Sequence, residues 1–377
     1  MKRRYLLTPG PSPVPSVIRE AISQEIMHHR TDEFIQILQE VNEGLKYIFC
    51  TKNPVIIFAS SGTGAMEASV SNFFSPNDKV VIIVGGKFGE RWLEIAKSFG
   101  LQPLVMQIEP GFAPSTNELK KILQDNPDTK GVFTTLTETS TATVFDIKSI
   151  AALTKDKNIL LLVDAISGLI QDQLLTDEWG VDVVVSASQK GFMLPPGLSF
   201  ICINKKAESF LKNSKLPKYY FDLDKALKAY QKNDTPFTPA VSLIMGLKKS
   251  IELIKNEGLE NLWEKYKKMS LATQAAAKAL GLEVFSKNPS SSVTAIVSPS
   301  GLNAKDIVKK LRKEYGISIA AGQGELEQRI FRIAHMGWIN EQDLIMCFSL
   351  LEKVLKSLGY KFNLGASLVA LQKSFYE

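Results

Sequence analysis

The feature that most restricts the fold is a regular alternation of short apolar runs and longer amphipathic segments between residues 54 and 203. The short runs are typical of buried strands, and the segments between them have helical periodicity. We therefore predict an α/β domain with a mostly parallel sheet. The expected strands are Val55–Ala59, Lys79–Val84, Leu101–Ile108, Gly131–Thr135, Ile159–Val163 and Val183–Ala187, and the expected helices are Thr63–Phe74, Phe88–Phe99, Thr116–Gln124 and Ile147–Thr154. A turn at Pro195, Pro196 and Gly197 separates the last strand from a second apolar run, Leu198–Ile203.

Composition excludes several classes of protein. The net charge of +6 is modest and the lysines are scattered, so we expect no nucleic-acid binding. No apolar run is long enough to cross a membrane. The three cysteines, Cys50, Cys202 and Cys347, have neither metal-ligand nor redox spacing. We predict a cytoplasmic protein with reduced thiols and no metal site.

Both ends of the chain depart from the alternation. Four prolines in the first fifteen residues predict an extended arm. After about residue 236 two long helices lead into a smaller α+β unit. We predict an arm at 1–15, a large α/β domain at 16–260 and a small domain at 261–377. The expected elements are helices Val17–Met27 and Asp32–Phe49, with Thr31 or Asp32 as N-cap, helices Val241–Asn256, Leu259–Leu280, Ala304–Tyr315, Glu341–Leu358 and Gly365–Glu377, and strands Leu282–Phe285, Ser292–Val297 and Arg329–Ala334.

Ligands of such sheets bind beyond the carboxyl ends of the strands, so the residues that follow each strand are candidates for a site. Ser60-Ser61-Gly62-Thr63-Gly64 follows the first strand and opens a helix. Free amides at a helix N-terminus, together with the hydroxyls of Ser61 and Thr63, favour a phosphate. A serine-capped helix start is the alternative, and the lysine of a Walker loop is missing.

Four further strand ends carry notable side chains. Phe88 follows the Lys79–Val84 strand, and Thr139 lies in a hydroxyl-rich turn, Glu138-Thr139-Ser140-Thr141. Asp164 directly ends an apolar run, where a carboxylate needs either a cationic partner or a role as helix N-cap. Lys190 follows the Val183–Ala187 strand, and its alternative role is a strand-end lysine that extends to solvent.

These parts complement one another at a single predicted sheet edge. Pyridoxal 5′-phosphate (PLP) needs a lysine for its Schiff base, an aspartate for its pyridine nitrogen, a phosphate site and a surface for its ring. Lys190, Asp164, the loop at Ser61–Gly64 and Phe88 supply these four parts. The combination predicts PLP as the cofactor.

Over nearly its whole length the chain resembles the class V aminotransferases of PLP fold type I, and within them the alanine–glyoxylate / serine–pyruvate aminotransferase group. The resemblance implies an aspartate-aminotransferase-like large domain with a mostly parallel seven-stranded sheet and a smaller α+β C-terminal domain. The motifs that carry it are TPGPSPVP, SSGTGAME, GGKFGERW, ETST, LLVDAISG, SASQKG, PPG, TPFTPAVSL and RIFRIAHMG.

The resemblance also implies roles for individual residues. Lys190 is implied to form the Schiff base and Asp164 to pair with the pyridine nitrogen. Arg332 is implied to bind the substrate α-carboxylate, for which its planar fork is suited. Gly10 and His29 are further substrate-binding candidates. The remaining implied cofactor contacts are Ser61, Gly62, Thr63 and Gln189 at the phosphate, Phe88 on the ring, Thr139 near the phenolic oxygen, and Thr235 and Thr238 from a partner subunit.

Members of this family are homodimers with shared active sites, and a tyrosine and a threonine of the partner reach the phosphate. Thr238 fits the threonine, whereas Thr235 stands where the family has the tyrosine. We therefore expect a homodimer in which Thr235 still offers a hydroxyl for a hydrogen bond.

The implied activity is ping-pong transamination between a small L-amino acid, such as alanine or serine, and a 2-oxo acid, such as glyoxylate or pyruvate. An anionic amino acid, phosphoserine or aspartate with 2-oxoglutarate, is an alternative in which His28, His29 and Arg30 read its side chain. These three residues also suit a plain inter-helix turn, and adjacent histidines on a helix diverge too much for a good metal site.

Two other functions stay open. Cysteine desulfurases and other PLP lyases on this fold place a histidine before the lysine and a mobile cysteine in the small domain. This chain has Gln189 before Lys190, and Cys347 lies in an apolar helical run. A non-catalytic subunit would be expected to lose cofactor residues, but Lys190, Asp164 and Arg332 are all present.

Overall fold

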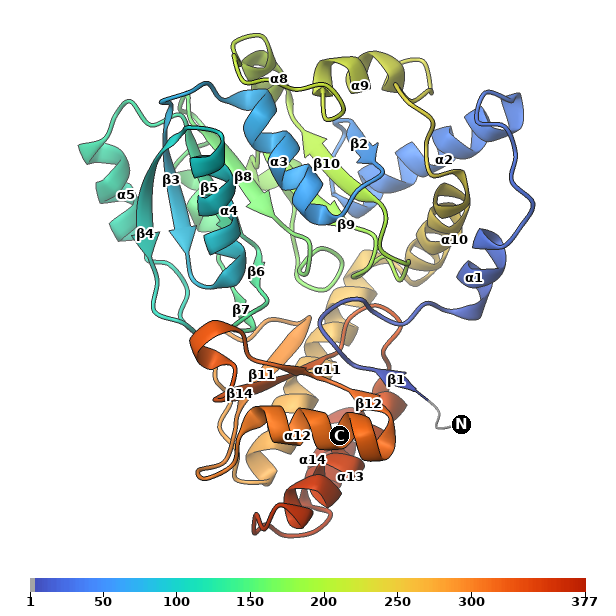
Figure 1. Ribbon diagram of the computed structural model, residues 1–377, viewed down its shortest axis with the longest axis vertical. Helices are drawn as coiled ribbons and strands as arrows, with labels where there is room; N and C mark the ends of the chain where they lie inside the picture. The colour runs from blue at the N-terminus through green and yellow to red at the C-terminus, as the bar shows by residue number, and fades with distance from the viewer. Residues whose placement is uncertain (1–3) are drawn as a thin grey trace.

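A seven-stranded sheet forms the centre of the larger part of the molecule (Figure 1). The computed structural model describes residues 4–377. Strand β10 is antiparallel to both of its neighbours, β2 and β9, and the remaining neighbours are parallel, as predicted. The order is β2 (Val55–Phe58), β10 (Ser199–Ile203), β9 (Val183–Ala187), β8 (Leu160–Asp164), β5 (Gly131–Thr135), β3 (Lys79–Val84) and β4 (Gln102–Gln107).

Helices cover both faces of this sheet, because its strands are apolar on both sides. Alternate residues point to opposite faces, so that Val184 packs in one hydrophobic core while Val183 and Val185 pack in the other. The first core includes residues of α2 (Asp32–Ile48), α5 (Thr116–Asp125), α6 (Ile147–Ala152) and α10 (Val241–Glu257), and the second includes residues of α3 (Gly62–Phe73), α4 (Lys87–Ser98), α8 (Lys205–Leu211) and α9 (Leu223–Tyr230).

The C-terminal part is built on an antiparallel three-stranded sheet of order β11-β14-β13, drawn at the bottom of Figure 1. The N-terminal arm crosses to this part, where Tyr5 and Leu6 (β1) pair in parallel with Ile317 and Ser318 (β12). The elements are β11 (Val293–Val297), β13 (Ala320–Ala321), β14 (Ile330–Ala334), α11 (Leu259–Ala279), α12 (Ala304–Lys310), α13 (Glu341–Ser357) and α14 (Ala366–Tyr376). A short hairpin of β6 (Thr137–Glu138) and β7 (Thr143–Val144) reaches from the large sheet toward it.

Two predicted elements were wrong in extent. Helix α1 spans Ser16–Ile22 instead of continuing to Met27, because residues 23–26 are exposed and have no core to pack against. The expected strand Leu282–Phe285 forms only an isolated bridge between Val284 and Ile296. The chain then leaves the sheet, and the Lys287 amide donates to Gly111 O at 2.8 Å instead.

Two other elements refine the predictions. Thr31 is the N-cap of α2, since its Oγ1 accepts a hydrogen bond from the Phe34 amide at 3.3 Å. The expected helix Ala304–Tyr315 continues past α12 as a π-helical turn over Leu311–Tyr315.

A four-residue helix, α7 (Thr176–Trp179), precedes β9. Within residues 4–377, no helix has both the length and the apolar character that crossing a membrane requires.

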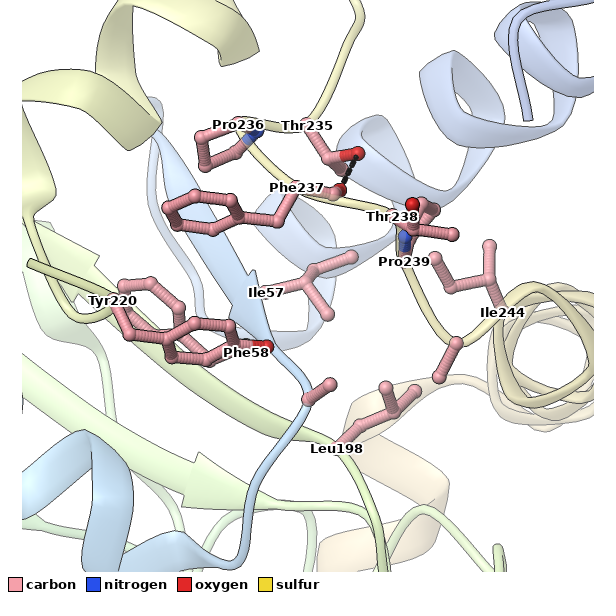
Figure 2. A pocket seen from close by; sticks show the side chains of 12 residues that line it. Ile57, Phe58, Leu198, Tyr220, Thr235, Pro236, Phe237, Thr238, Pro239 and Ile244 are labelled. Atoms are coloured by element: carbon pink, nitrogen blue, oxygen red, sulfur yellow. Dashed lines mark hydrogen bonds between the residues drawn. The ribbon is translucent and has the colours of Figure 1, made fainter.

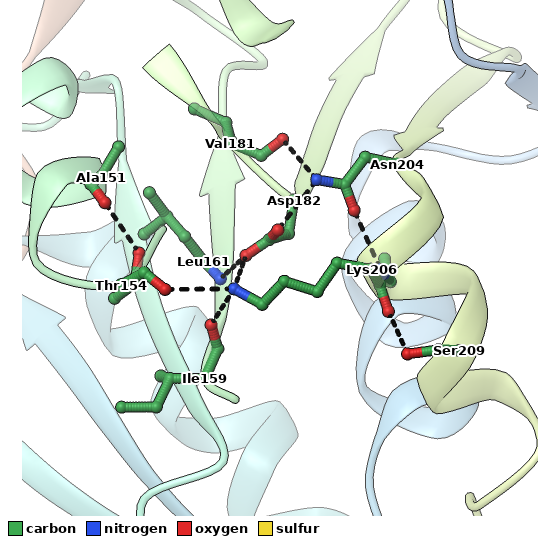
Figure 3. Close-up of polar contacts among 10 residues, drawn as sticks. Ala151, Thr154, Ile159, Leu161, Val181, Asp182, Asn204, Lys206 and Ser209 are labelled. Atoms are coloured by element: carbon green, nitrogen blue, oxygen red, sulfur yellow. Dashed lines mark hydrogen bonds and ion pairs between the residues drawn. The ribbon is translucent and has the colours of Figure 1, made fainter. Parts of the chain in front are cut away.

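A polar network joins the amino ends of the central strands to α8 (Figure 3). Asp182, 2% exposed, accepts hydrogen bonds from the Leu161 amide at 2.8 Å and from Asn204 Nδ2 at 2.8 Å. Lys206 Nζ lies 3.0 Å from Asp182 Oδ2 and donates to Ile159 O at 2.6 Å and Thr154 O at 3.2 Å. The buried carboxylate is thus paired and fully hydrogen-bonded at the edge opposite the carboxyl ends.

Candidate active site

Lys190 follows β9 at the carboxyl edge of the sheet and is 8% exposed, so it is not a solvent-facing lysine. Its Nζ donates to Pro9 O of the N-terminal arm. Ser12 Oγ donates to Lys190 O at 2.7 Å, and the Ser12 amide donates to Gln189 O at 2.9 Å. The arm therefore covers the lysine.

Gly10 is required where the arm crosses Lys190. Its φ is +106°, and a Cβ there would lie 2.4 Å from Lys190 Nζ. The predicted substrate-site residue Gly10 is thus in direct contact with the candidate catalytic lysine. A side chain at this position would collide with the amine.

Burial makes Lys190 easy to deprotonate. It lowers the pKa of Lys190 to about 8, with Asp164 opposing the shift and the cations Arg332 and Arg91 adding to it. A lysine with a pKa near neutrality can act as a nucleophile and as a base, which an ordinary solvated lysine cannot.

Asp164 ends β8 and is 3% exposed. Its Oδ1 accepts a hydrogen bond from the Ile166 amide at 2.8 Å, in a turn and not at the start of a helix, so the N-cap alternative was wrong. Burial raises the pKa of Asp164 to about 7, aided by Glu138 and opposed by the Ile166 amide, Arg91 and Lys190. A protonated ring nitrogen is the partner that would hold this carboxylate ionised.

The loop at Ser61, Gly62 and Thr63 has open hydrogen-bonding groups. Ser61 is the N-cap of α3 but makes no side-chain cap bond. Across residues 4–377 the Ser61 and Thr63 hydroxyls make no hydrogen bond, and a Cβ at Gly62 would lie 2.4 Å from Ile166 Cδ1, beside Asp164. Free amides and hydroxyls at the positive end of a helix fit a phosphate.

Phe88, Thr139 and Gln189 also lie at this edge. Half-buried Phe88 stands in the first turn of α4, and Arg91 Cζ lies 4.9 Å from its ring centroid. Thr139 Oγ1 donates to Ser167 Oγ at 2.7 Å. The Gln189 amide oxygen is buried and has no hydrogen-bond partner among the described residues. A phosphate accepts hydrogen bonds, so it would pair with the Nε2 donor of Gln189 and not with this oxygen.

Arg332 reaches this edge from the small sheet. It lies in β14 and is 4% exposed, and it donates from Nη2 to Ala321 O at 2.7 Å and from Nη1 to Thr139 O at 2.9 Å. Burial lowers its pKa to about 10, opposed by Glu138. The guanidinium therefore stays protonated, and no carboxylate in the described chain forms an ion pair with it. A substrate carboxylate would supply that charge.

Other predicted residues lie apart from Lys190 in the single chain. His28, His29 and Arg30 occupy the loop between α1 and α2, where the His28 and His29 rings are 4.8 Å apart. Thr235 and Thr238 line a different pocket, together with Phe58 and Tyr220 (Figure 2). Thr235 Oγ1 donates to Phe237 O at 2.8 Å, whereas Thr238 is exposed.

Three residues of this edge were not predicted from the sequence. Ser12 holds the arm on Lys190, Arg91 stands over Phe88, and Glu138 is a fully buried carboxylate next to Thr139. A single glutamate in the otherwise uncharged stretch 131–145 was a signal for the last. No group of three or more histidine, cysteine or acidic residues in the described chain could hold a metal ion.

Comparison with known proteins decides the family. The model of the family "Aminotransferase class-V" matches residues 4–334. The chain belongs to the class-V aminotransferases. The family and the aminotransferases among the relatives identify the chain as a transaminase, and Lys190, Asp164 and Arg332 lie within the matched residues.

Relatives of this class-V aminotransferase have several names. It is 39% identical to the soluble hydrogenase 42 kDa subunit of Anabaena cylindrica, over 98% of each chain. It is 33% identical to an L-aspartate–glyoxylate aminotransferase of Paracoccus denitrificans, over 98% of this chain and 96% of the other. The structure resembles ureidoglycine–glyoxylate aminotransferase of Bacillus subtilis with a TM-score of 0.96 and 26% identity, covering 100% of this chain and 99% of that one.

Proposed function

We propose that this class-V aminotransferase uses PLP to transfer an amino group from a small L-amino acid to a 2-oxo acid. The observation that carries the proposal is the buried Lys190, whose pKa burial lowers to about 8 and whose charge interacts with those of Asp164 and Arg332. When bound, PLP supplies an electron sink for the electrons released as the Cα proton leaves the substrate.

The residues of the chain have distinct tasks in this proposal. Lys190 would hold the cofactor, and its Nζ would take the Cα proton of the substrate as a general base. Asp164 would pair with the protonated ring nitrogen. Arg332 orients the substrate by its α-carboxylate, and the arm at Pro9 and Gly10 shields the lysine from water.

We propose alanine or serine as amino donor and glyoxylate or pyruvate as acceptor. The names of relatives support this choice, including serine–glyoxylate aminotransferase of Arabidopsis thaliana at 32% identity over 98% of this chain. An alternative donor is an anionic amino acid, which the name of the L-aspartate–glyoxylate aminotransferase of Paracoccus denitrificans supports.

The test is a panel of half-reactions in which PLP-loaded protein is mixed with one amino acid and the 2-oxo acid product is quantified. We expect alanine or serine to give the fastest turnover. Aspartate or phosphoserine as the fastest donor would favour the anionic alternative. In that case the single variants H29A and R30A should slow aspartate relative to serine, and unchanged ratios would exclude these residues from the choice of substrate.

Arg332→Lys tests the carboxylate contact. Lysine cannot reproduce the planar fork or its bonds to Ala321 O and Thr139 O. We expect the KM for the amino acid to rise about tenfold or more. The matched control is Arg329→Lys, at an exposed position outside the site, which should leave KM unchanged. An unchanged KM in R332K would contradict the proposed role of Arg332.

We further propose that the protein is a cytoplasmic homodimer in which Thr235 and Thr238 of one subunit reach the phosphate of the other. Exposed Thr238 supports this, because it lies outside its own subunit's site. The division into an arm (1–15), a PLP-binding domain (16–260) and a small domain (261–377) belongs to the same proposal. Light scattering of the holoenzyme should give twice the 41.7 kDa chain mass.

A non-catalytic subunit is the second candidate, favoured by the name of the Anabaena relative. The intact trio of Lys190, Asp164 and Arg332 speaks for an enzyme. A desulfurase has less support, because Cys347 is fully buried and burial raises its pKa to about 12, which disfavours a nucleophilic thiolate. Sulfide release from L-cysteine without transamination would reverse this preference.

A further inference from the structure

Glu138 is a fully buried carboxylate to which the mechanism above gives no task. It takes part in none of the ion pairs found among residues 4–377. A buried, unpaired carboxylate is costly unless hydrogen bonds compensate it. Its contacts therefore point to what it does.

All four hydrogen bonds that the Glu138 carboxylate accepts come from two neighbouring segments of the site. Oε2 accepts from the amides of Phe88 and Gly89, each at 3.1 Å. Oε1 accepts from the Ser140 amide at 3.1 Å and from Ser140 Oγ at 2.5 Å. Ser140 Oγ in turn accepts from the Lys87 amide at 3.0 Å. Glu138 and Ser140 thus bind the first three amides of α4.

These bonds replace an ordinary helix cap. The N-cap of α4 is Gly86, which has no side chain for this purpose. A Cβ at Gly86 would lie 2.2 Å from Ser140 Oγ and 2.7 Å from Glu138 Cδ, so glycine is what allows the carboxylate to approach. A negative charge at a helix N-terminus is also favoured by the helix dipole.

The same contacts connect three candidate site residues. Phe88 is held through its own amide. Thr139 lies between Glu138 and Ser140, and its carbonyl accepts the hydrogen bond from Arg332 Nη1. Glu138 also acts through charge, since it raises the pKa of Arg332 against the effect of burial.

We propose that Glu138 is a positioning residue that fixes Phe88 and Thr139 for the cofactor and so sets the affinity for PLP. The proposal rests on the proposed PLP-dependent function. Glu138 touches neither substrate nor cofactor in this account, and it acts through the first turn of α4 and the turn at Thr139.

The test compares Glu138→Gln with Glu352→Gln. Glu352 is 2% exposed and makes a similar set of bonds at the start of α14, accepting from the Gly365 amide at 2.7 Å and from the Ser367 amide and hydroxyl at 3.1 and 2.6 Å. Both variants exchange a buried carboxylate for an amide at a helix start. Only E138Q does so beside the site.

The first measurement is the Kd of PLP for each cofactor-free protein. We expect E138Q to raise the Kd about tenfold and E352Q to leave it unchanged. The second is amide hydrogen exchange without cofactor, which should speed up at residues 87–89 in E138Q alone. Equal Kd and equal exchange at 87–89 in wild type, E138Q and E352Q would overturn the proposal.

Misfolding of E138Q and failure of the proposed function can each be distinguished from failure of this proposal. If E138Q does not fold, Ser140→Ala removes the hydroxyl that links Glu138 to the Lys87 amide, and it should shift the Kd in the same direction by a smaller factor. An unchanged Kd in S140A would then count against the proposal. Failure of the wild-type protein to bind PLP would refute the proposed function itself, whatever the variants do.

Discussion

At the scale of single residues, burial controls the chemistry of Asp164 and Lys190. Both lie at strand ends, where Asp164 is 3% and Lys190 8% exposed. Burial raises the pKa of Asp164 and lowers the pKa of Lys190, so it favours the neutral form of each side chain. The cofactor-free site therefore holds two groups that titrate near neutrality. A cationic ring nitrogen beside Asp164 would restore its ordinary, ionised state.

The raised pKa of Asp164 predicts that the stability of the wild-type protein depends on pH. Asp164→Asn should remove this dependence. The pKa of Asp164 is about 7 in the folded chain and near its ordinary 3.8 when unfolded. The folded state thus binds more protons between these values, and stability falls as pH rises through this window. We measure the free energy of unfolding in urea for both cofactor-free proteins. The value for D164N minus the value for wild type should increase by about 2 to 3 kcal/mol from about pH 5 to about pH 7.

The control for this prediction is Asp128→Asn. Asp128 is exposed, and its hydrogen bond from Lys79 lowers its pKa, so it is ionised at both pH values. Its substitution should change stability by the same amount at both. If D164N and D128N behave alike, Asp164 does not carry a raised pKa in the folded chain.

The sequence predicted the residues of the site that have distinctive chemistry. Lys190, Asp164, Phe88 and Thr139 could be found because each follows an apolar strand. Glu138 could not be given a task, because two of the groups that donate to its carboxylate are the backbone amides of Phe88 and Gly89, about fifty residues away, which no side-chain pattern reveals. Arg332 was found only through a family motif, since nothing local indicates that its fork meets Thr139 O.

At the scale of elements, apolar periodicity predicted the positions of the strands and of the helices that cover the large sheet. The wrong predictions concern segments that do not pack on a core. Residues 23–26 are not helical, because they are exposed and have no core to pack against. The antiparallel direction of β10 depends on the turn at Pro195–Gly197 that returns the chain beside β9. The polar network at α8 was not predicted, because it joins residues from four separate segments.

Lys206→Met tests that network (Figure 3). The substitution leaves Asp182 buried without its cation, and we expect the free energy of unfolding to fall by about 3 kcal/mol. The neighbouring Lys205→Met is the control, because Lys205 is 81% exposed and its pair with Glu208 is worth about 0.5 kcal/mol or less. Equal effects in urea unfolding would show that the Asp182–Lys206 pair adds no stability. The Kd of PLP should not change in either variant.

At the scale of the whole molecule, three parts of the chain meet around Lys190. The large sheet supplies the lysine and Asp164, the arm covers the amine with Pro9 and Gly10, and the small sheet supplies Arg332. The arm is anchored at both ends, by β1, which pairs with β12 of the C-terminal part, and by Ser12 on the lysine loop. A site assembled from parts so distant in sequence depends on the complete fold.

The central claim is that Lys190 carries the cofactor, and chemical trapping tests it most directly. Protein loaded with PLP is reduced with sodium borohydride and digested, and the modified peptide is identified by mass spectrometry. We predict one modification per chain, on Lys190, and none in K190R. Modification of exposed lysines such as Lys205 with Lys190 unlabelled, or equal labelling of K190R, would contradict the account.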